Sequence, residues 1–202
     1  MTTLFETLAI KNGQILNLVY HNKRFKQGQI LLNRQTMIDD IASLIDIPSH
    51  FKDNQLIRCR VTYNNDDIKV AYFDYTPKPI TSFKLIEYNK IDYAYKYDDR
   101  SVLTSLLSQK GNCDEVIIIK NGFVTDCSIG NLLFFKNNHW YTPNTPLLEG
   151  AQRAYLLDKQ MIKLASIQQN DIWHYEKIMM INALNGFDED RAVEIAHALY
   201  DN

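Results

Sequence analysis

The side chains that could do chemistry lie in several short segments rather than in one motif. A lysine amine can act as a nucleophile, an arginine binds anions, and a carboxylate holds or returns a proton. A single residue of these types is more often a solvated surface charge than part of a site, so their order along the chain is the informative signal. The segments are residues 21–24 (HNKR), 96–100 (KYDDR), 114–116 (DEV), 121–132 (NGFVTDCSIGNL), 141–143 (YTP), 150–153 (GAQR) and 182–184 (NAL).

Other kinds of site have no support in the sequence. The histidines show no metal-ligand spacing with one another or with acidic residues, so no metal site is expected; they are His21, His50, His139, His174 and His197. There is no G-x-S-x-G segment of a serine hydrolase, and the surroundings of Gly111 and Gly122 do not form a phosphate loop. Cys59, Cys113 and Cys127 are widely separated and lack CxxC spacing, which predicts reduced thiols.

Length and charge limit the class of protein. The chain of 202 residues can form one core or two small lobes. A net charge of −2, from 22 basic and 24 acidic residues without long charged blocks, gives no support for a nucleic-acid or membrane partner. The longest apolar runs, near 116–119 and 178–181, are far shorter than the roughly 20 residues of a membrane-spanning helix. With no secretion signal at the N-terminus, a cytoplasmic location is expected.

The first third of the sequence predicts two hairpins and two helices. Residues 4–10 and 15–18 flank Asn12-Gly13, a dipeptide that suits a type I′ turn. Apolar residues then recur at helical spacing over 20–32 and 37–45, and Pro48 ends the second run. The strands of a second hairpin are predicted at 56–63 and 68–75, and the two prolines of 76–79 mark a connector and a lobe boundary.

The remainder is richer in strands, which favours an α+β fold over strict βαβ alternation. A helix is expected over 101–109, with Ser101 as its N-cap, and another from about Gly150 through Leu157. The turns Asn121-Gly122 and Asn137-Asn138 separate some of the expected strands. The strands are 83–88, 116–119, 123–125, 131–135, 140–142 and 178–181.

Taken in order, these segments resemble the class IV aminotransferase family, and most of all its aminodeoxychorismate lyase branch. The resemblance runs from Phe5-Glu6-Thr7 to about Ile195, with a shortened N-terminus. It implies the two-lobed fold of the fold-type IV pyridoxal-phosphate enzymes, as in D-amino acid aminotransferase, with a small α/β lobe over 1–79 and a larger lobe over 80–202. Pyridoxal 5′-phosphate would be held between the lobes, the larger lobe would carry the cofactor lysine, and a homodimer would be the usual unit.

The resemblance assigns the central chemistry to Lys96 and Asp126. Lys96 opens a segment like the family's K-x-x-N-R and would form the Schiff base with the cofactor, then move a proton, roles that favour a partly desolvated lysine. Asp126 stands at the acid of the family's V-T-E-x-x-x-x-N and would pair with the pyridine nitrogen, although it is one methylene shorter. A residue that bonds nearby backbone is the alternative interpretation of Asp126.

Phosphate binding would use Arg24, which matches the arginine of the family's H-x-x-R-L, together with backbone N–H groups. A surface salt bridge is the alternative for Arg24. Where the family has G-I-T-R this chain has Gly-Ala-Gln-Arg, so a threonine hydroxyl is lost at Gln152. The other cofactor-binding residues implied by the resemblance are Ser128, Ile129, Ala151, Gln152, Asn182 and Ala183.

Two residues are candidates for binding a small-molecule amine substrate. Arg58 lies where some family members carry a carboxylate-binding arginine, and strand alternation puts it on one face with Arg60. An exposed strand face is an equal alternative. Thr7 corresponds to a threonine near the family's active site.

Three functions follow from the resemblance. The first is a lyase of folate biosynthesis that converts 4-amino-4-deoxychorismate to 4-aminobenzoate and pyruvate. The second is an amino-acid aminotransferase, which would use the same lysine and require a keto-acid acceptor. The third is a non-catalytic relative, with or without the cofactor. Release of pyruvate without an added keto acid separates the first two.

Overall fold

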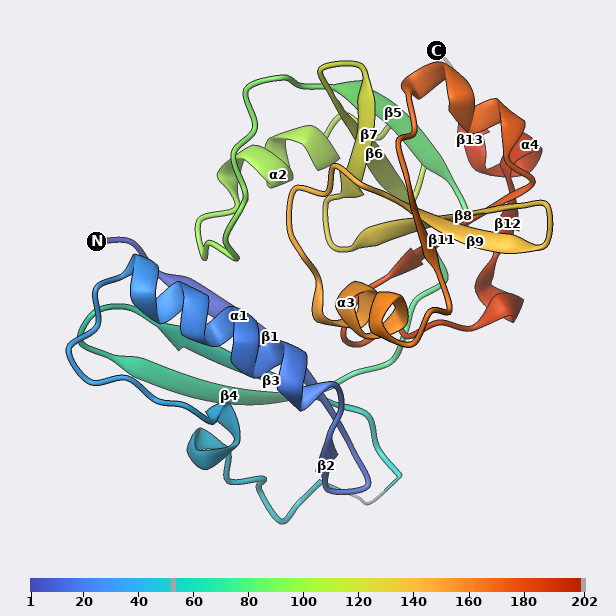
Figure 1. The fold of residues 1–202 in the computed structure, drawn as a ribbon. Helices are drawn as coiled ribbons and strands as arrows, with labels where there is room; N and C mark the ends of the chain where they lie inside the picture. The colour runs from blue at the N-terminus through green and yellow to red at the C-terminus, as the bar shows by residue number, and fades with distance from the viewer. Residues whose placement is uncertain (52–53, 201–202) are drawn as a thin grey trace. The chain divides into compact units, whose positions relative to one another are not determined.

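The computed structural model describes residues 1–51 and 54–200, and the chain divides into two compact units (Figure 1). The first unit is Met1–Pro77 with Tyr95–Asp99, and the second is Lys78–Ala94 with Arg100–Asn202. The division after Pro77 falls within the proline-containing connector at 76–79. Residues 95–99 group with the first unit, which differs from the expectation that the larger lobe carries Lys96.

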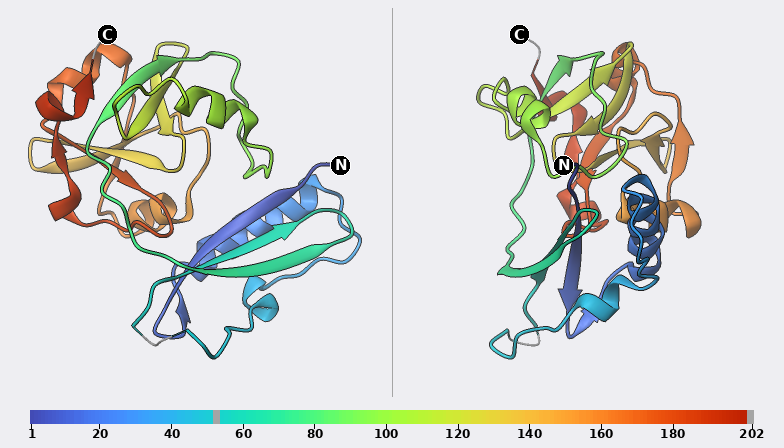
Figure 2. Two further views of the ribbon diagram at one scale, coloured as in Figure 1. Left: turned by 180° about the vertical axis from the view of Figure 1, so that it is seen from behind. Right: turned by 90° about the vertical axis from the view of Figure 1, so that its left-hand side faces the viewer.

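The first unit is an antiparallel sheet with one long helix against it. Its strands follow the order β2 (Gln14–Ile15), β1 (Leu4–Lys11), β3 (Ile57–Tyr63) and β4 (Ile68–Asp74), and α1 (Leu18–Leu31) runs along one face (Figures 1 and 2). Both hairpins and this helix are as the sequence predicts. Asn12 and Gly13 have φ values of 51° and 71°, the positive values that a type I′ turn requires.

The two faces of this sheet differ in chemistry because side chains alternate along each strand. One face packs against α1; its core includes Leu4, Leu8, Ile10, Phe25, Ile57, Cys59, Val61 and Tyr63. The other, which we call the arginine face, carries Phe5, Thr7, Arg58 and Arg60. The register establishes this grouping, since Thr7 lies opposite Arg60 and Phe5 lies opposite Thr62.

The predicted second helix at 37–45 is wrong except for one short 3-10 turn, Ile41–Leu44. Side chains of α1 bind the backbone that a helix would have used. The amide of Gln29 accepts from the Ile38 N–H and donates to its carbonyl, both at 2.9 Å, and Asn22 accepts from the Ile41 N–H at 2.9 Å. The apolar side chains therefore reach the core from a mostly extended segment.

Residues 95–99 lie along the free edge of β1. The Phe5 N–H donates to the Lys96 carbonyl and the Asp98 N–H donates to the Thr3 carbonyl, each at 2.9 Å. Tyr95 and Tyr97 pack against the core beneath α1. These main-chain and aromatic contacts hold Lys96 to the small unit, which a sequence boundary at residue 79 does not anticipate.

The second unit is a mixed sheet with short helices, which makes the whole fold α+β. Its strand order is β10-β9-β8-β7-β6-β5-β13, and β11 pairs with both β8 and β12. The β5–β6, β5–β13 and β9–β10 pairs are parallel, and the other pairs are antiparallel. The strands are β5 (Phe83–Glu87), β6 (Glu115–Lys120), β7 (Phe123–Cys127), β8 (Asn131–Lys136), β9 (His139–Pro143), β10 (Lys163–Ala165), β11 (Lys177–Ile181), β12 (Val193–Glu194) and β13 (Leu199–Tyr200).

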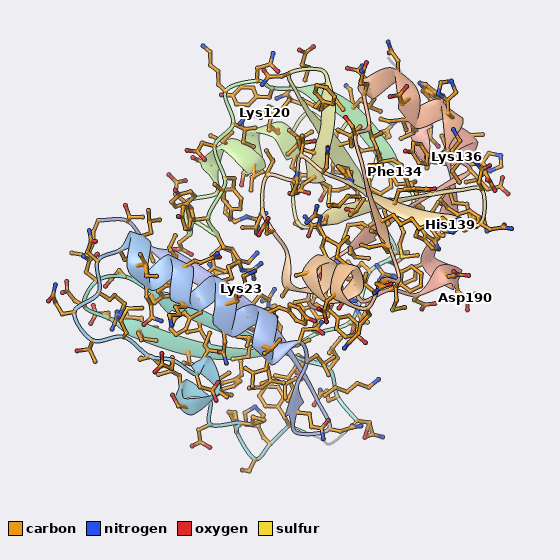
Figure 3. All side chains as sticks on the ribbon, viewed as in Figure 1. Lys23, Lys120, Phe134, Lys136, His139 and Asp190 are labelled. Atoms are coloured by element: carbon orange, nitrogen blue, oxygen red, sulfur yellow. The ribbon has the colours of Figure 1, made fainter. Side chains whose placement is uncertain are left out.

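Helices α2 (Ser101–Leu107), α3 (Ala151–Asp158) and α4 (Ile195–Ala198) accompany this sheet, with 3-10 turns at Gln169–His174 and Glu189–Arg191. Ser101 is the first helical residue rather than the N-cap, which is Arg100. The predicted strands and the turns at 121–122 and 137–138 are confirmed, each turn with two positive φ values. Figure 3 labels Lys136 and His139 at the ends of the second turn. In the part of the chain that the structure describes, every helix is too short or too polar to cross a membrane.

Candidate functional site

Lys96 lies on the arginine face beside Phe5. Its Nζ is 4.6 Å from the centre of the Phe5 ring, and the Cζ of Arg60 is 3.7 Å from the same centre. Arg60 also forms an ion pair with Asp98, two residues beyond the lysine. Cations over an aromatic face are attracted to it, so one buried phenylalanine holds the cationic groups of both side chains.

The two candidate substrate residues occupy the same face. Thr7 is half-buried opposite Arg60, and Arg58 lies opposite Phe73, with its Cζ 4.5 Å from the centre of that ring. The Nε of Arg58 is buried and makes no hydrogen bond in the described structure. The register therefore brings Lys96, Thr7 and Arg58 to one face of one sheet.

Arg24 points toward the core between helix and sheet, where it meets Glu6. Its Nε donates to Oε1 of Glu6 at 2.7 Å and its Nη2 donates to Oε2 at 2.6 Å. His21, one turn earlier on α1, places Nδ1 2.8 Å from the same Oε2. Lys23, labelled in Figure 3, is exposed instead. The surface salt bridge considered for Arg24 is thus replaced by an ion pair with a fully buried partner.

The charges in this cluster follow from its contacts. Burial acts to raise the pKa of Glu6, but the charge and hydrogen bonds of Arg24, with a smaller contribution from His21, hold it at about 2. Burial lowers the pKa of His21 despite the bond to Glu6, and the charges of Arg24 and Lys96 lower it further. Glu6 is therefore ionised and His21 is neutral near pH 7.

Asp126, at the end of β7, is buried and hydrogen-bonded on both oxygens. The Nδ2 of Asn131 donates to Oδ1 at 2.8 Å, and the N–H groups of Leu147 and Leu148 each donate to Oδ2 at 2.9 Å. Burial raises the pKa of Asp126 to about 6 against these bonds. These contacts match the alternative interpretation of Asp126 as a residue that bonds nearby backbone. A carboxylate has about four lone-pair positions, more than these three donors occupy. Pairing of Asp126 with a pyridine nitrogen therefore stays a prediction.

Ser128 faces a second buried carboxylate. Its hydroxyl donates to Oε2 of Glu115 at 2.7 Å, and its N–H is 3.4 Å from Oε1. Arg100 donates from Nη2 to the Ser128 carbonyl at 2.6 Å. Burial raises the pKa of Glu115, opposed by the Val116 N–H and Ser128. The Ser128 N–H expected to serve a phosphate is thus directed at Glu115.

The start of α3 presents Ala151 and Gln152 as its first two residues, both buried. Gly150 is the N-cap and supplies no side chain to the N–H groups of the first turn. A Cβ at Gly150 would clash with Oδ1 of Asn131, so any other residue here requires that amide to shift. The Nδ2 of Asn131 also donates to the Leu148 carbonyl at 2.9 Å, which fixes the approach to the helix.

Asn182 connects the 182–185 turn to the loop after β7. Its Oδ1 accepts from the N–H groups of Leu184 and Asn185 at 3.0 and 2.9 Å, and its Nδ2 donates to the Ile129 carbonyl at 3.1 Å. Ala183 lies within this turn, and the Ile129 side chain is exposed. Asn182 and Ile129 are therefore in direct contact.

The predicted residues thus form two groups, one in each unit. The first contains Lys96, Arg24, Thr7 and Arg58; the second contains Asp126, Ser128, Ile129, Ala151, Gln152, Asn182 and Ala183. Sequence reasoning missed the partners Glu6, His21, Glu115 and Asn131 as site residues. Each lies inside a segment that carries the resemblance, so the sequence marks the segment. It does not indicate which side chain each of these residues contacts. No cluster of His, Cys, Asp or Glu fit for a metal occurs among the described residues.

Comparison with known proteins gives a consistent result at the level of sequence. The family model described as amino-transferase class IV matches residues 3–187. An uncharacterized protein of Haemophilus influenzae is 45% identical over 188 residues, which cover 92% of this chain and 100% of that protein.

Solved structures agree. A candidate 4-amino-4-deoxychorismate lyase from Haemophilus somnus is 42% identical, with a TM-score of 0.85 over 93% of this chain and 98% of that one. A candidate amino-acid aminotransferase from Mesorhizobium loti, 20% identical, has a TM-score of 0.83 over 99% of this chain and 100% of that one, which shows a shared fold.

Proposed function

Because the chain belongs to the class IV aminotransferase family, we propose that it is a pyridoxal-phosphate-dependent lyase that converts 4-amino-4-deoxychorismate to 4-aminobenzoate and pyruvate. As a member of this family the protein is an enzyme that uses pyridoxal phosphate. The lyase is favoured by the 182–184 (NAL) segment, by KYDDR at 96–100, and by similarity to the Haemophilus somnus candidate lyase. The observation that carries the proposal is the position of Lys96 on the arginine face.

The residues present fit the cofactor in three respects. Lys96 supplies an amine whose backbone is fixed to β1. Arg24 supplies a guanidinium oriented by two bonds to Glu6. Among the described residues no side chain caps the N-terminus of α3, and the N–H groups of a helix N-terminus favour an anion. When bound, pyridoxal phosphate supplies an aldehyde that condenses with amines and a ring that withdraws electrons from the substrate.

Lys96 would move the proton in the reaction. Its Nζ, beside Phe5, would take the proton from the ring carbon that bears the substrate amino group. The bond between the ring and the ether oxygen then breaks, the side chain leaves as the enolate of pyruvate and takes up a proton on its methylene carbon, and the ring becomes aromatic, which makes the elimination favourable. Burial of the adjacent phenylalanine excludes water from one side of the amine.

Arg58 and Thr7 would bind the substrate. A guanidinium binds a carboxylate through two parallel hydrogen bonds, and the substrate carries carboxylates that such a group can hold. Phe73 supports the plane of the Arg58 guanidinium at 4.5 Å, and Thr7 offers a hydroxyl on the same face. In this proposal Asp126 stabilises the protonated pyridine nitrogen, with its pKa of about 6 set by burial.

The test compares the wild type with Lys96→Ala. The purified proteins are mixed with pyridoxal phosphate, reduced with borohydride and analysed by mass spectrometry. We expect a phosphopyridoxyl adduct on Lys96 and none in the variant. Lys136→Ala is the matched control, since that lysine also lies over an aromatic ring, 5.6 Å from the centre of Tyr175, and should keep the adduct.

Activity then separates the candidates. Release of pyruvate from 4-amino-4-deoxychorismate without an added keto acid supports the lyase. An adduct without that release, but with amino transfer to a keto acid, would assign the aminotransferase instead. Absence of any adduct on the wild-type Lys96 would contradict both enzymes and leave the non-catalytic relative.

A further inference from the structure

A charged cluster lies where the rest of the helix–sheet interface is apolar. Along β1, the side chains that face α1 are those of Leu4, Glu6, Leu8 and Ile10, all buried. Glu6 interrupts this hydrophobic row with a carboxylate that is 0% exposed. Its partners His21 and Arg24 are one turn apart on α1, with side chains 0% and 12% exposed.

The hydrogen-bond roles in the cluster follow from its charges. Neutral His21 has one protonated ring nitrogen, and the carboxylate can only accept, so Nδ1–H donates to Oε2 of Glu6 at 2.8 Å. Oxygen Oε2 thus receives both His21 and the Nη2 of Arg24, while Oε1 receives the Nε of Arg24. Among the residues that the structure describes, the Nε2 of His21 is left as a buried acceptor without a hydrogen-bond partner.

Such an arrangement is poorly suited to stability alone. Replacing a buried ion pair by apolar side chains of similar volume is often neutral or stabilising, and an unpaired buried nitrogen adds a further penalty. Leucines at positions 4 and 8 show what that row of β1 otherwise accepts. What the cluster does provide is a fixed guanidinium, because two parallel bonds that it donates to one carboxylate determine both its position and its plane.

The cluster also lies within electrostatic reach of the lysine, since the charge of Lys96 contributes to the lowered pKa of His21. We infer that Glu6 is a positioning residue that fixes the Arg24 guanidinium to receive the cofactor phosphate, with His21 holding the second carboxylate oxygen in place. The inference rests on the proposed function. It assigns Glu6 a task that opposes simple electrostatics, because a carboxylate next to Arg24 repels a phosphate.

The two possible roles of Glu6 therefore predict opposite changes in phosphate binding when Glu6 is replaced. If Glu6 positions Arg24, removing its charge or retracting its carboxylate weakens phosphate binding. If Glu6 only balances the charge of Arg24, Glu6→Gln makes the site more positive and strengthens phosphate binding. The quantity to measure is phosphate preference, the dissociation constant for pyridoxal divided by that for pyridoxal phosphate, obtained by absorbance titration of each ligand.

Glu6→Asp is the main variant, because it keeps the charge and withdraws the carboxylate by one methylene, so that both Arg24 bonds cannot be kept. We expect it to lower the phosphate preference about ten-fold, the effect of one lost charge-assisted hydrogen bond. Glu6→Gln should lower it as well. In an Arg24→Gln background neither change should lower it further, because Glu6 acts through Arg24.

Two controls separate positioning from general damage. Leu8→Val also removes one methylene from the same row of β1, and Glu194→Asp makes the same substitution at an exposed glutamate. Both should leave the phosphate preference within about two-fold of wild type. A similar drop in the phosphate preference of Leu8→Val would show that the effect of Glu6→Asp comes from altered core packing, and would overturn the inference.

The outcomes also distinguish this inference from the proposed function. A wild type that binds neither ligand contradicts the proposed function and the inference together. A wild type that prefers pyridoxal phosphate, with Glu6→Asp retaining that preference or Glu6→Gln increasing it, overturns the positioning role alone. Circular dichroism checks that each variant is folded, and Glu6→Asp carries the test if Glu6→Gln does not fold.

Discussion

Glu6 and Asp126 are buried carboxylates in different units, and each accepts three hydrogen bonds, yet their pKa values move in opposite directions. Burial raises the pKa of both. At Glu6 the adjacent Arg24 overcomes this and the pKa is about 2, whereas at Asp126 the direct donors are neutral and the pKa is about 6. A cation in direct contact, rather than the number of donors, decides the charge state of a buried acid.

The difference in pKa suits Glu6 and Asp126 to different tasks. Glu6 keeps its charge at every pH at which the protein would work, which a fixed anchor for Arg24 requires. Asp126 titrates close to neutrality, so its carboxyl can share or hold a proton near pH 6. The same residue chemistry thus gives a permanent anion in the small unit and a titratable acid in the large one.

The largest effect should come from removing the anion of the pair. Glu6→Leu leaves Arg24 in an apolar interface without its carboxylate, and we expect a loss of about 3 kcal/mol in the free energy of unfolding, measured by urea denaturation. Glu6→Leu combined with Arg24→Leu should recover stability to within about 1 kcal/mol of wild type. A double variant as unstable as the single one would show that Arg24 is not the reason for the loss.

Glu6 and Asp126 should make the free energy of unfolding change with pH in opposite directions. The folded pKa of Glu6, about 2, lies below its ordinary value of 4.5, so its contribution is present above pH 4.5 and is lost as the pH falls toward 2. The folded pKa of Asp126, about 6, lies above its ordinary 3.8, so stability declines as the pH rises from 4 to 6. At 1.36 kcal/mol per pKa unit, each change is at most about 3 kcal/mol.

Urea midpoints from pH 2 to 8 measure both slopes. Asp126→Asn should remove the decline between pH 4 and 6 and leave the lower slope intact, while Glu6→Gln should flatten only the rise below pH 4.5. A decline between pH 4 and 6 that survives Asp126→Asn belongs to another group. Glu115, whose pKa burial also raises, is then the next to test.

A smaller loss is expected from the hydrogen bonds of Asp126 themselves. Asp126→Asn keeps one carbonyl oxygen for the Leu147 and Leu148 N–H groups but presents an amide nitrogen to Asn131. We expect a loss of about 1–2 kcal/mol at pH 4, below the range in which Asp126 ionises in the folded protein, and faster hydrogen exchange of the Leu147 and Leu148 amides. Unchanged exchange at those two amides would contradict the role of Asp126 in holding the backbone at Leu147 and Leu148.

Most of the fold could be predicted because its signals are local. The turns at 12–13, 121–122 and 137–138 use Asn or Gly at positions of positive φ, and the long strands show β-branched and aromatic runs. The failure at 37–45 has a physical reason. Helical spacing of apolar residues also arises when an extended segment is bound by side chains elsewhere, here those of Gln29 and Asn22.

The candidate site shows the same difference between local signals, which the sequence carries, and long-range contacts, which it does not specify. Lys96, Arg24 and Asp126 could be chosen from segments whose order resembles a family, but which groups contact them could not. Glu6 is 18 residues from Arg24, and Leu147 and Leu148 are 21 and 22 residues from Asp126. Such pairings depend on strand register and loop paths, which periodicity does not specify.

The ion pair between Arg60 and Asp98, 38 residues apart, is a partly exposed counterpart of the buried pair of Arg24 and Glu6. The side chains are 31% and 42% exposed, so water screens the charges that burial leaves unscreened at Glu6 and Arg24. Asp98→Asn should therefore change the free energy of unfolding by less than about 1 kcal/mol, measured by urea denaturation at low salt and at about 1 M salt, where screening acts within about 3 Å. A loss comparable to that of Glu6→Leu would show that the Phe5, Arg60 and Asp98 contacts hold the Lys96 segment in place cooperatively, and exposure would then fail as a guide to the strength of the pair.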